Sequence, residues 1–237
     1  MAFLSSKSGT QPPVQELLPL ERLPLPVTNL PGLNEAAIDA LGRLRVSPDF
    51  LALHGERGSG KTHLLLWAAF ANGGWAPYFD CAEDPKSWQG LASLADASVL
   101  FLDNVDAWAG QPRAEEQLFI LYNYRKNNKL AWVVSSRTTP GQCPWTLPDW
   151  ASRVAGATHY GLVRPGEEEL TAILRQQAKN RGRCLPDTLL HHLLRQEERN
   201  LAKLVPLLDD FYDWLSRWHG SPSVRQWRRY CKERNGG

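Results

Sequence analysis

Apolar residues in the first two thirds of the chain gather in short runs that are separated by stretches with helical spacing. The continuous runs are residues 50–53, 98–102 and 130–134. Runs without polar alternation are typical of strands covered on both faces, as in a buried parallel sheet. Apolar positions recur every three or four residues over residues 34–44, 61–71 and 115–126, which predicts helices packed on that sheet. The alternation of strands and helices predicts an α/β fold.

The pattern changes after Pro165, where only helical spacing remains. The predicted helices cover residues 167–181, 187–196, 201–218 and 224–233. Pro206 is expected to bend or break the first turns of the third helix, because proline removes a hydrogen-bond donor and crowds the preceding turn. Ser221 or Ser223 is expected to cap the last one. Residues 165–237 are therefore predicted to form a small all-helical lid domain.

The beginning of the chain has a different composition. Six of the 17 prolines lie in the first 31 residues, which favours extended rather than helical backbone. We interpret residues 1–28 as an extended tail, with Asn34 as the N-cap of the first predicted helix. Residues 29–164 are then predicted to form the α/β domain.

One motif between the first predicted strand and the next helix carries chemistry. Residues 55–62 read Gly-Glu-Arg-Gly-Ser-Gly-Lys-Thr and satisfy the phosphate-binding P-loop pattern G-x-x-x-x-G-K-[ST] in the strand–loop–helix context that it requires. Glycines let backbone N–H groups surround phosphate oxygens, the lysine contacts the outer phosphates and the threonine can ligate Mg²⁺. An ordinary glycine-rich turn is the alternative. The candidate nucleotide-binding residues are Gly55, Gly58, Ser59, Gly60, Lys61 and Thr62.

A second candidate is Asp103, which ends the apolar run 98–102, where a P-loop protein places a carboxylate for Mg²⁺. The alternative is a turn or capping residue. Asn104 follows where an ATPase of this class usually carries a second acid, and an amide cannot act as a base. On an extended strand Asp106 would point elsewhere, so we expect weak ATPase activity at most.

Composition narrows the remaining possibilities. No apolar run approaches the roughly 18 residues that a membrane-spanning helix needs, and the start of the chain lacks a secretory pattern, so we expect a soluble, cytoplasmic protein without a membrane partner. The four cysteines are widely spaced, which disfavours a zinc cluster or a redox dithiol. A net charge of +2 does not by itself indicate a nucleic-acid partner.

Residues 23–233 resemble the AAA+ proteins of the bacterial DnaA/Hda replication family, and the shorter relative Hda most. The resemblance rests on the P-loop, on the Leu-Asp-Asn-Val segment at 102–105 and on Ser-Ser-Arg-Thr-Thr-Pro at 135–140. It implies an AAA+ parallel-sheet domain with a helical lid that binds ADP or ATP with Mg²⁺ through Thr62 and Asp103. It also implies that Asn34 belongs to the nucleotide pocket and that Ser135 or Ser136 approaches the γ-phosphate.

Two further implications of the resemblance concern regulation. Residues 147–153 resemble the segment that carries the arginine finger, so Arg153 would reach a nucleotide bound by a neighbouring subunit. An arginine is suited to this role because its rigid fork contacts phosphate oxygens bidentately. A surface arginine that pairs with Asp149 is the alternative. Ala202 stands where DnaA has an arginine that senses ATP, with Lys203 as a poorly placed substitute, which favours resident ADP. The alternative is that Lys203 restores some ATP sensing.

The tail suggests a partner. Residues 15–20, Gln-Glu-Leu-Leu-Pro-Leu, resemble the peptide by which Hda docks on the DNA polymerase III sliding clamp, although Glu16 replaces a leucine. The candidate clamp-binding residues are Gln15, Leu18, Pro19 and Leu20. An extended peptide of this kind would be ordered only when bound. A proline-rich linker with a cluster of leucines is the alternative.

These features favour an Hda-like negative regulator of DNA replication initiation, which contacts DNA through the clamp and stimulates hydrolysis of ATP bound to DnaA in trans. The alternatives are a DnaA-like, DNA-binding initiator or helicase-loader relative and a nucleotide-dependent scaffold. The basic last helix, in which Trp227 and Tyr230 interleave with arginines, is the candidate for direct DNA contact, and a simply solvated face is the alternative. The lack of a helix-turn-helix segment before Gly237 argues against origin recognition. Assembly with further copies of the chain is left open.

Overall fold

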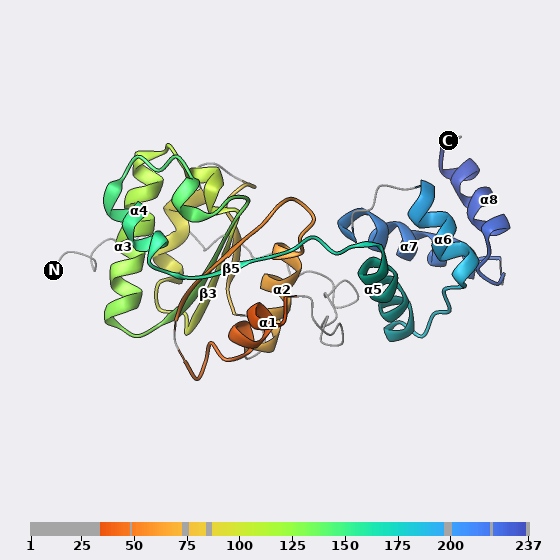
Figure 1. Ribbon diagram of the computed structural model, residues 1–237, viewed down its shortest axis with the longest axis horizontal. Helices are drawn as coiled ribbons and strands as arrows, with labels where there is room; N and C mark the ends of the chain where they lie inside the picture. The colour runs from red at the N-terminus through yellow and green to blue at the C-terminus, as the bar shows by residue number, and fades with distance from the viewer. Residues whose placement is uncertain are drawn as a thin grey trace.

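A five-stranded parallel sheet forms the centre of the first part of the molecule (Figure 1). The computed structural model describes residues 34–47, 49–72, 76–83, 87–196, 201–218 and 220–235. The strands are β1 (Phe50–His54), β2 (Tyr78–Asp80), β3 (Val99–Asp103), β4 (Ala131–Ser136) and β5 (Thr158–Gly161). Their order in the sheet is β2-β3-β4-β1-β5, with β4 and β5 on either side of β1. The predicted α/β class and parallel sheet are confirmed.

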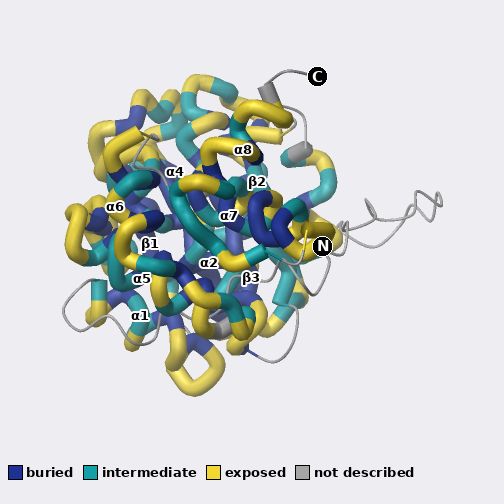
Figure 2. The backbone as a smooth tube through the Cα atoms, turned by 90° about the vertical axis from the view of Figure 1, so that its right-hand side faces the viewer, coloured by how far each residue is buried: buried dark blue, intermediate teal, exposed yellow. Residues whose placement is uncertain are grey.

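Helices cover both faces of this sheet, which explains the continuous apolar runs. Because neighbouring residues of a strand point to opposite faces, Leu51 and Leu53 pack with α1 (Glu35–Gly42) and α2 (Lys61–Ala71), whereas Ala52 belongs to the other layer. That layer contains α3 (Pro112–Asn127) and α4 (Pro148–Ala155). Figure 2 shows the buried segments enclosed by exposed outer turns.

The strands β2 and β5 and the helix α4 were not predicted from periodicity. The two strands have only three and four residues, none of them fully buried, so they lack the apolar signal of the central strands. Helix α4 buries only Trp150 and Val154, a single pair at helical spacing, which gives no repeating period. Three short 3₁₀ segments complete this part of the described chain: η2 (Ser87–Leu94), η3 (Val105–Trp108) and η4 (Pro140–Gln142).

Several predicted boundaries needed correction. Helix α1 ends at Gly42 rather than Leu44, and Asn34 occupies its N-cap position with a left-handed φ of 57° and without capping through its side chain. Helix α3 begins earlier than predicted, at Pro112, because proline is well suited to the first turn of a helix, where its missing N–H is not needed.

The second part of the described chain is helical throughout and has a hydrophobic cluster of its own. Its helices are α5 (Glu167–Asn180), α6 (Asp187–Gln196), α7 (Leu201–Ser216) and α8 (Val224–Asn235). Helix α7 continues across Pro206, so the predicted break does not occur. The apolar face with Leu204, Leu208 and Phe211 is buried, and this burial outweighs a penalty of about 3 kcal/mol for proline inside a helix. Ser223 caps α8, since its hydroxyl accepts a hydrogen bond from the N–H of Gln226 (3.3 Å).

No helix within the described ranges combines the length and the apolar character needed to cross a bilayer. Four tryptophans, at positions 108, 132, 150 and 227, are almost completely buried, as expected for core residues. Trp218 differs, with an exposed fraction of 51%.

A buried carboxylate ties α3 to the start of α4. The Glu115 side chain accepts hydrogen bonds from the backbone N–H groups of Gly110 (2.8 Å), Thr146 (2.8 Å) and Leu147 (2.6 Å). We expect Glu115→Ala to lower the free energy of unfolding by about 3 kcal/mol, because it leaves three backbone donors without a charged acceptor. Denaturant titration measures this change.

The neighbouring Glu116 is exposed and provides the matched control. Glu116→Ala should change the free energy of unfolding by less than about 0.5 kcal/mol. Equal stability of the two variants would contradict the assigned role of Glu115.

Candidate nucleotide-binding site

The loop between β1 and α2 has a backbone that only glycine tolerates at its tightest points. Gly60, directly before α2, has a φ of 94°, in the left-handed region. At Gly55, a Cβ atom would lie 2.6 Å from the carbonyl oxygen of Leu162 and 2.9 Å from the Ser59 hydroxyl. The buried Ser59 hydroxyl has no hydrogen-bond partner in the described part of the chain. The loop therefore presents N–H groups, the α2 N-terminus and a spare hydroxyl at one place, which is what a polyphosphate requires.

Lys61 carries the positive charge of this loop. Its ammonium group donates to the carbonyl oxygens of Gly55 (2.6 Å) and Glu56 (3.1 Å). Partial burial lowers the pKa of Lys61, the carboxylates of Asp103 and Asp106 oppose this effect, and Arg137 adds to it. Lys61 forms no salt bridge within the described ranges, so an anionic phosphate group fits beside its ammonium group.

Asp103 lies fully buried at the carboxyl end of β3 and accepts hydrogen bonds from Thr62 and Ser135, both of which were predicted for the same site. Its Oδ2 accepts hydrogen bonds from Thr62 (2.6 Å) and from the Tyr78 hydroxyl (2.9 Å). Its Oδ1 accepts from the Ser135 hydroxyl and from the N–H of Asn104 (3.1 Å). A carboxylate beside a hydroxyl at a phosphate-binding loop is a suitable donor set for Mg²⁺, which takes few protein ligands and keeps phosphate and water oxygens. Mg²⁺ would neutralise phosphate charge here, with Thr62 and Asp103 holding it.

Of the two candidate serines in β4, Ser135 is the one that joins this cluster. Its hydroxyl also accepts a hydrogen bond from the N–H of Asn104 (3.0 Å). The Ser136 hydroxyl instead donates to the carbonyl oxygen of Thr138 (2.7 Å) within the turn that follows. Asn34 forms no hydrogen bond with Asp103 or Ser135 among the described residues; its side-chain oxygen accepts from the N–H of Val163 (3.2 Å), next to Leu162, whose carbonyl oxygen adjoins Gly55 of the loop.

The residues that follow β3 turn sharply, which corrects one expectation. Asn104 has a left-handed φ of 55°, and its amide donates to the Asp80 carboxylate (2.9 Å). Asp106 therefore does not continue an extended strand. Its carboxylate accepts a hydrogen bond from the N–H of Arg137 (3.3 Å) and raises the pKa of Lys61, so it faces the phosphate-binding end of the sheet.

Tyr78, Asp80 and Arg137 are site residues that sequence reasoning missed. Tyr78 and Asp80 lie on β2, whose three residues are too few to show a hydrophobic pattern. The one weak signal for this strand was an acidic residue directly after two aromatic residues. Burial and the neighbouring Asp103 raise the pKa of the Tyr78 hydroxyl far above its ordinary value, so it remains a hydrogen-bond donor. Arg137 directly follows β4 and adds a second cation near Lys61.

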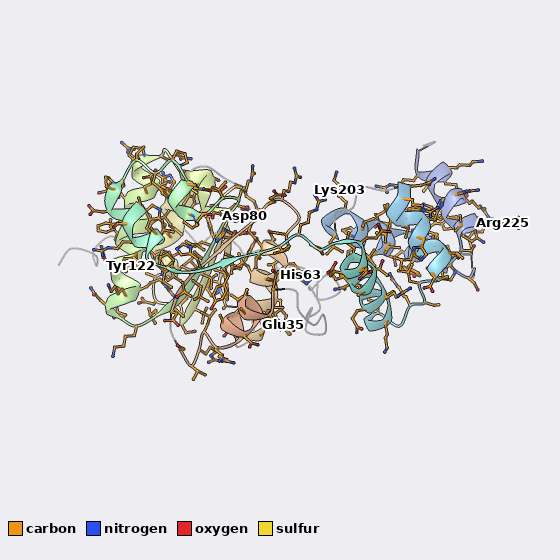
Figure 3. The ribbon with its side chains drawn as sticks, in the orientation of Figure 1. Glu35, His63, Asp80, Tyr122, Lys203 and Arg225 are labelled. Atoms are coloured by element: carbon orange, nitrogen blue, oxygen red, sulfur yellow. The ribbon has the colours of Figure 1, made fainter. Side chains whose placement is uncertain are left out.

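Arg153 lies at the other end of the sheet. It belongs to the last turn of α4, is exposed, and places its guanidinium carbon 5.6 Å from the centre of the Tyr122 ring. Tyr122 in turn packs on Phe50, the first residue of β1, whereas residues 55–62 follow the last residue of the same strand. Figure 3 shows Tyr122 and Asp80 at separate places in this part of the molecule. Asp149, one helical turn before Arg153, forms no salt bridge with it among the described residues.

Solved structures share this fold. Domain III of the replication initiation protein DnaA from Thermotoga maritima matches with a TM-score of 0.68 and 19% identity, over 83% of this chain and 90% of that domain. A replication initiator DnaA bound to AMPPCP and single-stranded DNA matches with a TM-score of 0.63 and 18% identity, over 80% of this chain and 66% of the initiator. The chain has the AAA+ fold of DnaA.

The same AAA+ fold occurs beyond replication initiators. The Holliday junction branch migration motor RuvB of Thermotoga maritima matches with a TM-score of 0.59 and 16% identity, over 82% of this chain and 67% of that protein. No protein-family model matches the chain. Identities of this size show the fold alone, and the chain spans just under two thirds of the DnaA initiator, so its activity has to be argued from the site.

The remaining candidate residues lie in the helical part or outside the described residues. Lys203 lies in the first turn of α7 and is exposed (Figure 3). In α8, Trp227 and Tyr230 are buried, so only the basic residues of this helix are exposed as candidates for DNA contact. The clamp-binding candidates Gln15, Leu18, Pro19 and Leu20 lie outside the described residues, as does the rest of the tail.

Proposed function

We propose that this chain is an Hda-like regulator of replication initiation that holds ADP and activates hydrolysis of ATP bound by DnaA. The single observation that carries the proposal is the separation of two groups within one AAA+ fold. Lys61 lies at the carboxyl end of the sheet, and Arg153 packs near its amino end. Since Arg153 lies away from the phosphate-binding loop of its own chain, a nucleotide bound by another subunit is the target that suits it.

The chemistry at the chain's own site favours a holder of nucleotide over a fast ATPase. The loop at residues 55–62 would bind the phosphates, and Thr62 with Asp103 would hold Mg²⁺. The side-chain amide of Asn104 donates a hydrogen bond to the Asp80 carboxylate (2.9 Å), and an amide cannot act as a base that activates water. AMPPCP in a DnaA structure with the same fold supports an adenine nucleotide as the ligand. Ala202 stands where the DnaA family, which the chain resembles, has an arginine that senses ATP. This difference supports ADP as the resident nucleotide.

The partner chemistry follows from the arginine. A guanidinium supplied in trans stabilises the charge that develops on a transferring phosphoryl group and accelerates hydrolysis about a thousandfold or more. The chain would therefore act as an activator, and the nucleotide bound by DnaA would be hydrolysed. The deciding assay measures hydrolysis of [γ-³²P]ATP preloaded on DnaA, with and without the chain and the clamp loaded on DNA. No acceleration at any concentration of the chain would exclude the proposal.

Docking through the tail is the second part of the proposal. Replacing Gln15 and Leu18 together with alanine should reduce the stimulated rate at limiting chain concentration about tenfold, to the level seen without the clamp, because a short extended peptide depends on a few anchoring side chains. Titration of the chain against clamp-loaded DNA measures the effect.

The matched control replaces Gln11 and Leu4, the same residue types in the same tail, and should behave like the unmutated chain. If both double variants retain clamp dependence, residues 15–20 are an ordinary proline-rich linker.

A direct DNA-binding initiator has one observation in its favour, the exposed cations of α8 at positions 225, 228, 229, 232 and 234. Clamp-independent DNA binding with a steep salt dependence would favour that alternative.

A further inference from the structure

The Tyr122 ring lies against two cations that have no carboxylate partner. The Arg153 guanidinium carbon lies 5.6 Å from the ring centre, and the Lys126 ammonium lies 5.7 Å from it. Both distances fall within the range in which a cation is attracted to an aromatic ring. Within the described ranges neither cation forms a salt bridge, although Asp149 lies one helical turn from Arg153. Two uncompensated positive charges on one exposed site indicate an anionic ligand supplied by another molecule.

The ring itself is held by the core of the α/β part. Phe50 packs edge-on against Tyr122, with ring centres 5.6 Å apart and an interplanar angle of 63°. Trp132 lies 6.4 Å from Tyr122 and stacks on Phe50 at 4.5 Å. Trp150 of α4 packs against both Phe50 (6.2 Å) and Trp132 (5.9 Å). One aromatic cluster therefore fixes the Tyr122 ring on α3 and the backbone of the helix that carries Arg153.

This arrangement solves a problem that any exposed arginine finger has. An unrestrained arginine side chain occupies many rotamers, and ordering it in the transition state costs about 2 kcal/mol of conformational entropy. Contact with a ring that the core already holds restricts those rotamers before the partner arrives. Because the ring contributes no hydrogen-bond acceptor to its face, the N–H groups of the guanidinium stay available to phosphate oxygens.

We propose that Tyr122 is the positioning residue for Arg153: its ring holds the guanidinium extended for the phosphates of a nucleotide bound by the partner molecule. The proposal rests on the trans activation proposed above and deepens it. Tyr122 does not touch the reacting atoms. Lys126 shares the ring and adds positive potential at the same place.

The test compares Tyr122→Leu with Tyr122→Phe in the full chain, using ATP preloaded on DnaA and clamp loaded on DNA. Tyr122→Leu removes the ring and should lower the maximal stimulated rate about 3- to 10-fold. The concentration of chain that gives half of the maximal rate should stay unchanged, because docking does not use Tyr122. Tyr122→Phe keeps the aromatic face and should restore the maximal rate. Progressive fluorination of a phenylalanine at this position, which weakens the attraction of the ring for cations, should lower the rate in steps.

Tyr124→Leu is the matched control. Tyr124 lies on the same helix, is exposed, and donates its hydroxyl hydrogen bond to Asp96 rather than contacting Arg153. This variant should stimulate hydrolysis like the unmutated chain. Thermal unfolding of all variants distinguishes a loss of folding from a loss of the positioning of Arg153.

A second readout does not depend on hydrolysis. The NMR signal of the Arg153 Nε–H group, assigned by its disappearance in Arg153→Lys, should show restricted motion in the unmutated chain and in Tyr122→Phe, and free motion in Tyr122→Leu. Equal mobility in all three proteins would overturn the proposal, and so would a full maximal rate with Tyr122→Leu or a Tyr122→Phe variant as defective as Tyr122→Leu. If the unmutated chain fails to stimulate hydrolysis at all, the proposed function is wrong, and the NMR comparison alone decides whether Tyr122 positions Arg153.

Discussion

Replacing Lys61 with alanine should lower the affinity of the chain for ADP and ATP about 30- to 100-fold. The ammonium group lies in a loop that offers backbone donors, and it contacts two carbonyl oxygens rather than a carboxylate. A charge-assisted hydrogen bond to phosphate in a partly buried site contributes about 2.0–2.8 kcal/mol, which corresponds to this loss. Isothermal titration calorimetry with ADP measures the change directly.

The control for this prediction is Lys179→Ala, an exposed lysine in the last turn of α5. It should bind ADP like the unmutated chain, and both variants should unfold at similar temperatures without nucleotide. Stabilisation by added ADP should disappear only in Lys61→Ala. Undiminished binding by Lys61→Ala would show that the nucleotide site lies elsewhere and would remove the basis of the regulatory proposal.

Replacing Arg153 with alanine should abolish stimulation, with a loss of about a thousandfold in the accelerated rate of ATP hydrolysis on DnaA. The physical reason is the loss of a bidentate guanidinium at the charge that develops on the phosphoryl group. Because Arg153 packs near the amino end of the strands and Lys61 follows their carboxyl end, the same variant should bind ADP with unchanged affinity. Single-turnover hydrolysis and calorimetry on one preparation test both halves of this prediction.

Two further variants sharpen the result. Arg153→Lys keeps the charge and loses the planar fork, so it should recover only a small part of the rate. Arg195→Ala, at an exposed arginine in the last turn of α6, should stimulate fully. Full stimulation by Arg153→Ala would reduce Arg153 to a surface residue stacked on Tyr122.

The site was predictable where its chemistry depends on adjacent residues in the chain. Residues 55–62 form a contiguous motif, and Asp103 ends a run of apolar residues, so their positions at the carboxyl edge of a parallel sheet followed from pattern alone. The structure then brings the Thr62 hydroxyl within 2.6 Å of the Asp103 carboxylate across 41 residues of sequence. The metal role of this pair stays a prediction, since ligand binding has to be measured.

The neighbours of that pair were not predictable. Asp106 was expected to point away, because an extended strand alternates its side chains, and the left-handed turn at Asn104 reversed that geometry. Tyr78 and Asp80 belong to a strand of three residues, which carries too few positions for a period. In α8, spacing alone did not reveal which face packs against α7, and Trp227 and Tyr230 belong to the hydrophobic cluster of the helical part.

The amino-acid sequence by itself determined the α/β class, the central strands, the helices of the second part and the phosphate-binding loop, because each depends on local periodicity or on a contiguous motif. Tertiary structure alone decided the strand order, the face to which Asp106 turns and the contact of Arg153 with Tyr122. Those features depend on which segments pack together over long separations in the chain. Phe50, Tyr122 and Arg153 are far apart in sequence, and only the shared aromatic core brings them to one place.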